Sequence, residues 1–436
     1  MRFLELWRAF WFRPAPLSRL AVFRVLVMAL VCVEFIAYEP MLIAGSELAH
    51  ARVEGAFWNP VFAVSALGLD PPTPEFARSV VVFGLAAALC ALVGLATNVS
   101  CAMAGGALVY CAAMVYSFEK VHHDKVALAF TLAVLPLAPI GARWSLDCAL
   151  GRVLRAWRND SVAGRPELSE FARFPLRFTQ ATLALGYGAA GVSKLVVAGP
   201  QWANGYTLMS FLAEFDQPWS RWIGGDVVRM TVFSVFALAV QLAFPALLFW
   251  PRLAWGLVPA VVVNHIVNWM TLDTGPYASL WFLTIAFVPF ERVPGWVRET
   301  LCSASWLRRA LGLLVPLAPT ALMTWLWFAH YLPAWVAIVF VPLGATALLA
   351  LSRTTRLRLG FDPRRRRSRV LAAVVESMDW SDRFELVALA SPERATFDGL
   401  VRVTGAGVGE RVGALALARE LPLLAPWARL WRAQVA

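Results

Sequence analysis

Long apolar runs, separated by short charged segments, dominate the first 352 residues of the chain. A helix needs about 20 apolar residues to cross the hydrocarbon core of a bilayer. Runs close to this length fall at residues 18–38, 77–97, 99–117, 124–141, 174–193, 230–250, 253–271, 276–291, 311–329 and 333–352. The pattern therefore predicts an all-α polytopic membrane protein with about ten transmembrane helices.

The pattern changes after residue 352. Residues 352–369 (SRTTRLRLGFDPRRRRSR) are dense in arginine, which is typical of a juxtamembrane segment that stops transfer and touches anionic lipid. RVLAAVVESMDW then has a helical period, and RFELVAL has the character of a strand. GLVRVTGAGVG reads as a strand and a glycine turn, before a closing amphipathic helix. We expect a small cytoplasmic α/β tail.

Charge sets the expected orientation, because cytoplasmic loops of membrane proteins are enriched in lysine and arginine. The segment before residue 20 is basic, the 39–76 loop is acidic, and the 142–173 loop holds six arginines. Ten alternating helices place both termini and the arginine-rich loops in the cytoplasm. The net charge of +11 is then explained by basic residues that flank apolar runs, and no nucleic-acid partner is expected.

The composition and the motifs exclude several kinds of functional site. Hydrophobic residues make up 59% of the chain and charged residues 15%, and the 20 tryptophans suit aromatic belts at two membrane interfaces. The six cysteines are scattered without CxxC or CxxH spacing, so neither a zinc site nor a disulfide framework is indicated. GxSxG, P-loop and GxGxxG motifs are absent from the sequence, which leaves hydrolase and nucleotide-binding functions without support.

Lys194 is one of only three lysines, against 36 arginines. Where a fixed charge suffices this chain uses arginine, which cannot lose its proton, whereas a desolvated lysine can act as a general base. The alternative is a lysine that ends a span and snorkels to the interface. Both interpretations stay open at this position.

Histidines accompany Lys194 on the side expected to face outward. His122 and His123 stand with Asp124 in the loop FEKVHHDK, and they are either functional or simply exposed. His265 lies within an apolar run between Asn264 and Asn268, where such a polar stripe either joins helices or serves a site. Ionisable residues in spans usually face the bundle interior or a cavity. We expect Lys194 and these histidines to line one outward-facing pocket that holds no metal.

Four segments give the chain a resemblance to a known family. They are the HHD-type loop before the fourth run, WSLD at residues 144–147, AGVSKL…W..GY at 190–206, and NHIVN…G.Y at 264–277. In these strings the chain resembles the horizontally transferred transmembrane domain family, which includes the vitamin K-dependent gamma-glutamyl carboxylase. The resemblance covers roughly residues 15–295.

The resemblance implies a function and its residues. Lys194 falls on the family's base, which takes a proton from a reduced quinone of the vitamin K or menaquinol type, and His123 (or His122) and His265 fall on assisting positions. We therefore expect Lys194, His123 and His265 to be catalytic. The quinone and substrate pocket is expected to contain six further residues of these strings: His122, Asp124, Asn264, Asn268, Trp202 and Tyr206. The reaction implied is a quinol-linked carboxylation or oxygenation of a small or peptide substrate.

The same resemblance gives the domain organisation. Residues 1–295 are expected to form the carboxylase-like transmembrane domain, 296–352 an additional helix pair, and 353–436 the basic segment and a degenerate thioredoxin-like tail. We expect no counterpart of the large outer domain with which the carboxylase engages its protein substrate. We expect a multi-pass protein of the bacterial inner membrane. The alternative function is a non-catalytic transporter or an assembly factor for exported products.

Overall fold

The computed structural model describes residues 2–51, 58–118, 125–158, 167–215, 218–272, 278–289, 357–379, 384–389, 400–404 and 407–412. This part of the chain is mostly helical. Within it, six helical segments are long and apolar enough to cross a membrane: Leu17–His50, Pro74–Val93, Thr97–Phe118, Arg173–Asn204, Val227–Leu248 and Pro251–Thr271. These segments indicate a multi-pass membrane protein, as the apolar runs predicted.

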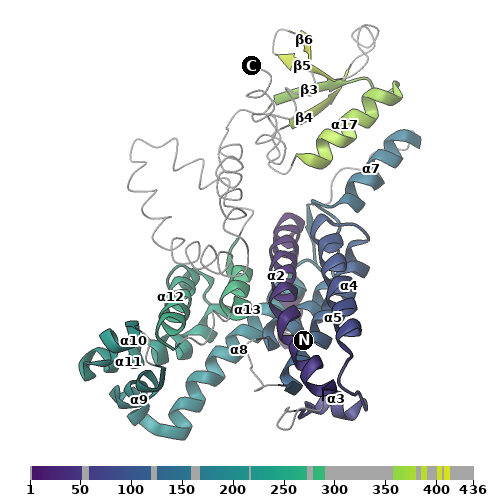
Figure 1. Cartoon of the computed structure of the whole chain (residues 1–436). Coiled ribbons are helices and arrows are strands. Elements are labelled where there is room, and N and C mark those ends of the chain that lie inside the picture. Colours follow the sequence, from purple (N-terminus) through teal and green to yellow (C-terminus); the bar gives the residue numbers. More distant parts are fainter. Residues whose placement is uncertain are drawn as a thin grey trace, which may run out of the picture.

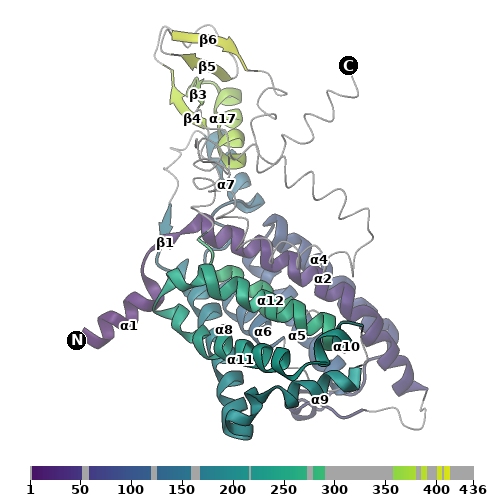
Figure 2. The same ribbon diagram turned by 90° about the vertical axis from the view of Figure 1, so that its left-hand side faces the viewer.

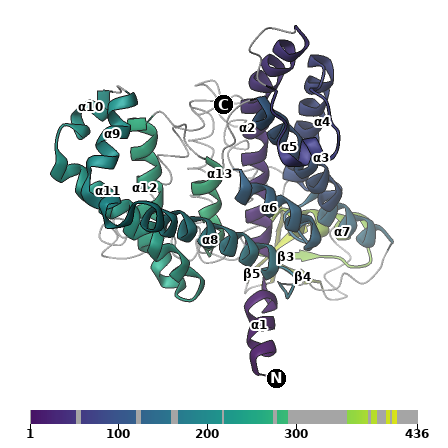
Figure 3. The ribbon, with the colours of Figure 1, turned by 90° about the horizontal axis from the view of Figure 1, so that it is seen from below.

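The first group of helices packs around α2 (Leu17–His50), which lies along α4 (Pro74–Val93) and α5 (Thr97–Phe118) (Figures 1 and 3). The helices approach closely at Gly84 of α4, where an added Cβ would collide with the ring of Phe35 and touch Ala107. Lipid tails are as apolar as the side chains, so helices in a membrane associate through tight packing, and small residues permit it. The short α3 (Phe62–Ala66) lies between α2 and α4 in the chain and contacts α5.

The second group of helices follows residue 172. It comprises α8 (Arg173–Ala198), η2 (Gly199–Asn204), α9 (Tyr206–Phe215), α10 (Pro218–Gly224), α11 (Val227–Ala243), η3 (Phe244–Leu248), η4 (Pro251–Leu253) and α12 (Ala254–Leu272). Figure 3 shows α9 to α12 together on the side of α8 away from α4 and α5. Helix α8 thus joins the two groups.

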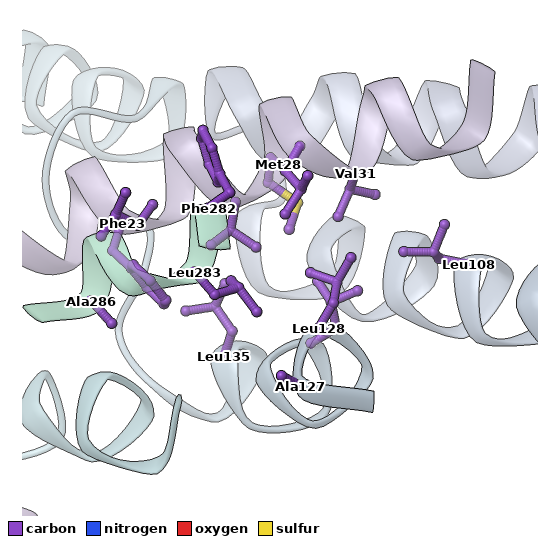
Figure 4. Close-up of a cluster of buried hydrophobic side chains, with 14 of the residues drawn as sticks. Phe23, Met28, Val31, Leu108, Ala127, Leu128, Leu135, Phe282, Leu283 and Ala286 are labelled. Carbon is purple, nitrogen blue, oxygen red and sulfur yellow. The ribbon is translucent and has the colours of Figure 1, made fainter. Parts of the chain in front are cut away.

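Two short segments fill the space between these groups. The first is α6 (Val126–Val134) with η1 (Leu135–Leu137), and the second is α13 (Ala278–Trp281) with η5 (Phe282–Phe287). Both contact α8, and α13 contacts α6. Figure 4 shows how their side chains meet α2 in one apolar cluster: Phe23, Met28, Val31, Leu108, Ala127, Leu128, Leu135, Phe282, Leu283 and Ala286.

These two segments differ from the expected fourth and eighth transmembrane helices. At 1.5 Å per α-helical residue and 2 Å per 3₁₀ residue, each is roughly 20 Å long, against a hydrocarbon core of about 30 Å. The first is cut short by the prolines at 136 and 139, which cannot donate to a helix. The expected helices at 311–329 and 333–352 lie outside the described residues, so the number ten is not confirmed.

A second difference concerns the expected 39–76 loop. Helix α2 continues through Pro40 and ends at His50, so the first third of that segment is helical. Proline lacks only one donor, and the preceding turns of α2 are held by buried contacts with the neighbouring helices. The structure describes the rest of this segment from residue 58 onward.

The N-terminal helix, the described parts of the 142–173 segment and the described C-terminal strands and helix gather at one end of the bundle (Figure 2). There lie α1 (Arg2–Phe12), β1 (Ala15–Pro16), which pairs antiparallel with β2 (Leu168–Ser169), and α7 (Leu146–Arg158). We call this the basic end, because it carries Arg13, Arg19, Arg152, Arg155 and Arg158. The segments that the positive-inside rule assigns to one side thus lie at one end of the bundle.

The described residues of the C-terminal part form a four-stranded sheet of order β4-β3-β5-β6 and one helix. The strands are β3 (Leu357–Phe361), β4 (Phe384–Ala388), β5 (Leu400–Thr404) and β6 (Gly407–Arg411), and α17 (Arg366–Met378) connects the parallel pair β3 and β4. Helix α17 packs on α7, where the Arg369 Nε donates to the Ala156 carbonyl at 2.9 Å. The likeness of this part to a thioredoxin-like module stays a prediction.

Candidate functional site

Helices α8 and α12 meet through a buried polar pair. The Tyr187 hydroxyl and the His265 Nε2 lie 2.8 Å apart and share a hydrogen bond. Both side chains are buried, and the Tyr187 ring packs 4.6 Å from the Phe244 ring, centroid to centroid. The histidine that the sequence singled out therefore has a neighbour that the sequence did not single out, enclosed by aromatic rings.

Lys194 lies two turns after Tyr187 on the same face of α8. Residues i, i+3, i+4 and i+7 of a helix share a face, so Tyr187, Ala190, Gly191 and Lys194 form one row. The ammonium of Lys194 donates to the Ala190 carbonyl at 3.3 Å and lies 5.3 Å from the centre of the Trp202 ring. Lys194 is half-buried, and its Nζ points back along α8 towards Tyr187.

The other members of the expected pocket are placed as follows. Trp202 in η2 is half-buried under Lys194, and Asn264 and Asn268 are half-buried beside His265 on α12. Tyr206 begins α9 with its side chain 63% exposed. The loop residues His122, His123 and Asp124 lie outside the described residues. A single cavity shared by Lys194, His265 and His123 remains a prediction.

A buried ion pair lies in the other group of helices, and sequence analysis missed it. Lys125, at the start of α6, donates to Glu34 of α2 at 2.8 and 2.9 Å. The Glu34 side chain is only 4% exposed, and the Lys125 ammonium also lies 5.8 Å from the centre of the Tyr38 ring. The signal available in the sequence was an acidic residue inside the apolar run at 18–38, since charged residues in spans are rare.

The depth of this pair along α2 is informative. The ring of Phe118, at the end of α5, lies against Gly45, whereas Lys125 meets Glu34. Eleven residues of helix separate these two contact points on α2, which is about 16 Å at 1.5 Å per residue. Helix α6 therefore begins well inside the bundle. Lys125, the charged residue directly before it, needs the buried Glu34 carboxylate as a partner.

The WSLD string has a structural role in the described part. Asp147 accepts hydrogen bonds at one carboxylate oxygen from the backbone N–H of Ala96, and at the other from the backbone N–H and hydroxyl of Thr97. These donors stand at the N-terminus of α5, where helix amides lack partners of their own. Asp147 thus fixes the turn between α4 and α5.

Arg24 completes this arrangement from α2. It is fully buried and donates to the carbonyls of Ile140 (3.0 Å) and Trp144. Burial raises the pKa of Asp147, but the hydrogen bonds from Thr97 and Ala96 and the charge of Arg24 outweigh it, so that the pKa lies below its ordinary value of 3.8. WSLD is therefore a tie between the basic end and the first group of helices.

Within the part of the chain that the structure describes, no three His, Cys, Asp or Glu side chains are grouped so that they could hold a metal ion. Comparison with known proteins adds no family to the description: no family model, no curated protein and no solved structure matches the chain.

Proposed function

We propose that the protein is a membrane enzyme similar to the vitamin K-dependent gamma-glutamyl carboxylase, with Lys194 as the base of a quinol-linked reaction. The observation that carries this proposal is the row on α8: Lys194 shares a face with Tyr187, which is hydrogen-bonded to His265 of α12. A titratable amine and a buried imidazole from two helices thus lie on the same side of α8.

The residues around this row suit a reduced quinone. Its ring oxygens require hydrogen-bonding partners and its ring requires flat apolar walls; His265 and Lys194 offer the former, Trp202 and Phe244 the latter. When bound, a reduced quinone would supply two electrons and an acidic hydroxyl. Lys194 would accept a proton at Nζ, and His265, held by Tyr187, would position an oxygen.

In this proposal the substrate is a small molecule or a peptide, and the site faces outward. The chain lies in the bacterial inner membrane with both termini in the cytoplasm, and the basic end of the bundle is the cytoplasmic end. A pocket on the opposite side is open to the outer leaflet, through which a quinone tail has access. A membrane setting is supported by the six apolar helices.

The test separates a titrating base from a fixed charge. Lys194→Arg and Lys194→Ala should abolish function equally, because arginine keeps its charge at every accessible pH, and loss of a general base costs on the order of 10²- to 10⁴-fold in rate. The readout is the phenotype of a deletion strain complemented at matched expression. Ser193→Ala, at the exposed neighbouring residue, is the control and should remain active.

A second measurement addresses the quinone. Mass spectrometry of the purified protein should detect a quinone that is lost in Lys194→Ala and retained in Ser193→Ala. Full activity of Lys194→Arg, or a wild-type protein without quinone that nevertheless complements, would refute the carboxylase-like mechanism.

One observation favours a transporter as the second candidate. The half-length segments α6–η1 and α13–η5 meet inside the bundle, and short or interrupted helices of this kind build the central sites of secondary transporters. Under that function Lys194→Arg would be silent, while Glu34→Leu/Lys125→Met, which removes both charges of the ion pair together, would abolish transport. The two sets of variants therefore distinguish the candidates.

A further inference from the structure

Helix α1 presents an apolar surface at the basic end that no described residue covers. Four large side chains of its first two turns are mostly exposed: Phe3 (73%), Leu4 (68%), Leu6 (65%) and Trp7 (55%). Figure 2 shows that α1 stands away from the bundle and runs in a different direction from α2. A helix in this position, at the end of a set of spans, lies where the membrane interface would be.

The last turn of α1 is fixed to the start of α8 by aromatic packing. The Phe12 ring stacks on the Phe174 ring with centroids 5.5 Å apart, and the Trp11 ring lies 6.1 Å from Phe174 and 6.4 Å from Phe178. Aromatic residues concentrate at the level of lipid headgroups in membrane proteins. The junction of α1 and α8 has this composition.

Arginines surround the same junction. Arg173 donates through Nε to the Phe10 carbonyl at 2.9 Å, and the guanidinium of Arg177 lies 4.9 Å from the centre of the Phe10 ring. Arg13 and Arg19 are close enough to Arg173 to repel it electrostatically. In the described part of the chain Arg13, Arg173 and Arg177 form no ion pair, and Arg8, which pairs with Glu170 at 3.5 Å, is an exposed exception.

Arg173 and Arg177 each have terminal N–H groups that donate to no described residue. Arg173 uses only its Nε among the described residues, and Arg177 uses one terminal nitrogen, which donates to Gln180 at 2.9 Å and reaches the Leu248 carbonyl at 3.4 Å. The terminal nitrogens of a guanidinium match phosphate oxygens in a two-pronged geometry. One turn of α8 separates these two arginines, so they lie on one face.

We propose that α1 and the arginines Arg13, Arg173 and Arg177 form a binding site for an acidic phospholipid. The phosphate group lies against the arginines, and the exposed apolar side chains of α1 insert among the upper parts of the acyl chains beside it. The positive charge of the site favours an acidic lipid over an apolar protein segment as the ligand, because three arginines without an ion pair among the described residues require an anion. The continuity of the site with the first residues of the α8 span places that anion at headgroup depth.

The first test counts bound lipid. Purified full-length protein is mixed with phosphatidylglycerol and phosphatidylcholine at equal amounts and examined by native mass spectrometry. At about 1 kcal/mol per arginine, Arg173→Gln/Arg177→Gln should bind phosphatidylglycerol roughly 30-fold more weakly, without change for phosphatidylcholine. Arg78→Gln/Arg364→Gln, which removes two exposed charges outside the proposed site, should bind like the wild type.

The second test does not depend on removing arginines. A fluorophore on a cysteine at Trp7, in a background lacking the native cysteines, is placed in vesicles of phosphatidylcholine with or without phosphatidylglycerol. With phosphatidylglycerol, brominated acyl chains should quench it and aqueous iodide should not; the same label at Arg364, exposed on the C-terminal part, should show the reverse. Equal lipid binding by both double variants, or a Trp7 label quenched by iodide in both vesicles, would overturn the proposal and leave α1 as a surface for a protein partner.

Discussion

Replacement of Asp147 tests whether the WSLD string holds the fold together. Its carboxylate accepts three hydrogen bonds, at 2.8 Å from the Ala96 N–H and at 2.7 and 2.6 Å from the N–H and hydroxyl of Thr97. Thr97 is 1% exposed, so water cannot readily replace the lost acceptor there. We expect Asp147→Ala to destabilise the protein while leaving the proposed site on α8 untouched.

The magnitude follows from the number and kind of these bonds. A hydrogen bond to a charged group contributes about 1.5–3 kcal/mol, and loss of a helix-capping residue costs about 0.5–2 kcal/mol. Since Asp147 is itself half-exposed and the three bonds are not additive, we expect a loss of about 2–4 kcal/mol for alanine. Asp147→Asn should lose about 1–2 kcal/mol. An asparagine side chain keeps one oxygen that can accept, but its amide nitrogen cannot accept a hydrogen bond from whichever backbone N–H, of Ala96 or of Thr97, it faces.

The pH dependence has a definite sign. The pKa of Asp147 in the folded protein is lower than the ordinary 3.8, so the folded state binds this proton less readily than the unfolded state. The stabilisation is therefore fully present above pH 3.8 and is lost as the pH falls through the lowered pKa. The difference between wild type and Asp147→Asn should shrink in that range.

The assay is reversible unfolding in mixed micelles, followed by circular dichroism from neutral pH downward. Asp70→Asn provides the control, since Asp70 is exposed and its replacement should not change the stability. Wild-type stability of Asp147→Ala at neutral pH would refute the structural role.

Three further predictions follow from the described contacts. A cysteine at Asn204, in a background without native cysteines, should react with a membrane-impermeant reagent on intact cells; labelling only after lysis would reverse the proposed orientation. Lys125→Met should cost about 3–5 kcal/mol by removing the ammonium that neutralises the buried Glu34 carboxylate, while Glu34→Leu/Lys125→Met should recover most of it in a double-mutant cycle. Tyr187→Phe should destabilise by about 1–3 kcal/mol through the lost bond to His265, and an unchanged unfolding curve would show that this bond contributes nothing.

The apolar pattern predicted the long helices well and the short ones poorly. The runs at 18–38, 99–117 and 174–193 lie inside α2, α5 and α8, because bilayer thickness fixes how much apolar sequence a span needs. The run at 124–141 is equally apolar but contains Pro136 and Pro139, and its helical part ends at Leu137. Apolarity alone does not distinguish a full span from a half-length segment buried among other helices.

The pattern of apolar residues could not predict contacts between residues that are far apart in the sequence. Glu34 and Lys125 are 91 residues apart, and nothing near either residue indicates the other. The sequence drew attention to His265 as a polar residue in an apolar run, but its partner Tyr187 looked like any aromatic residue of an apolar helix. The resemblance to the carboxylase family did not distinguish Asp147, which ties two loops, from Lys194, which we propose to be catalytic.

The partners of Arg24 have a consequence for the order in which the protein is made. Arg24 enters the membrane with α2, but the carbonyls that it bonds belong to residues 116 and 120 positions later. At a synthesis rate of about 5–20 residues per second, this arginine waits roughly 6–24 s for its partners to leave the ribosome. During that interval α2 carries a guanidinium without these two acceptors, and its apolar length and its packing on α4 and α5 have to hold it in the bilayer.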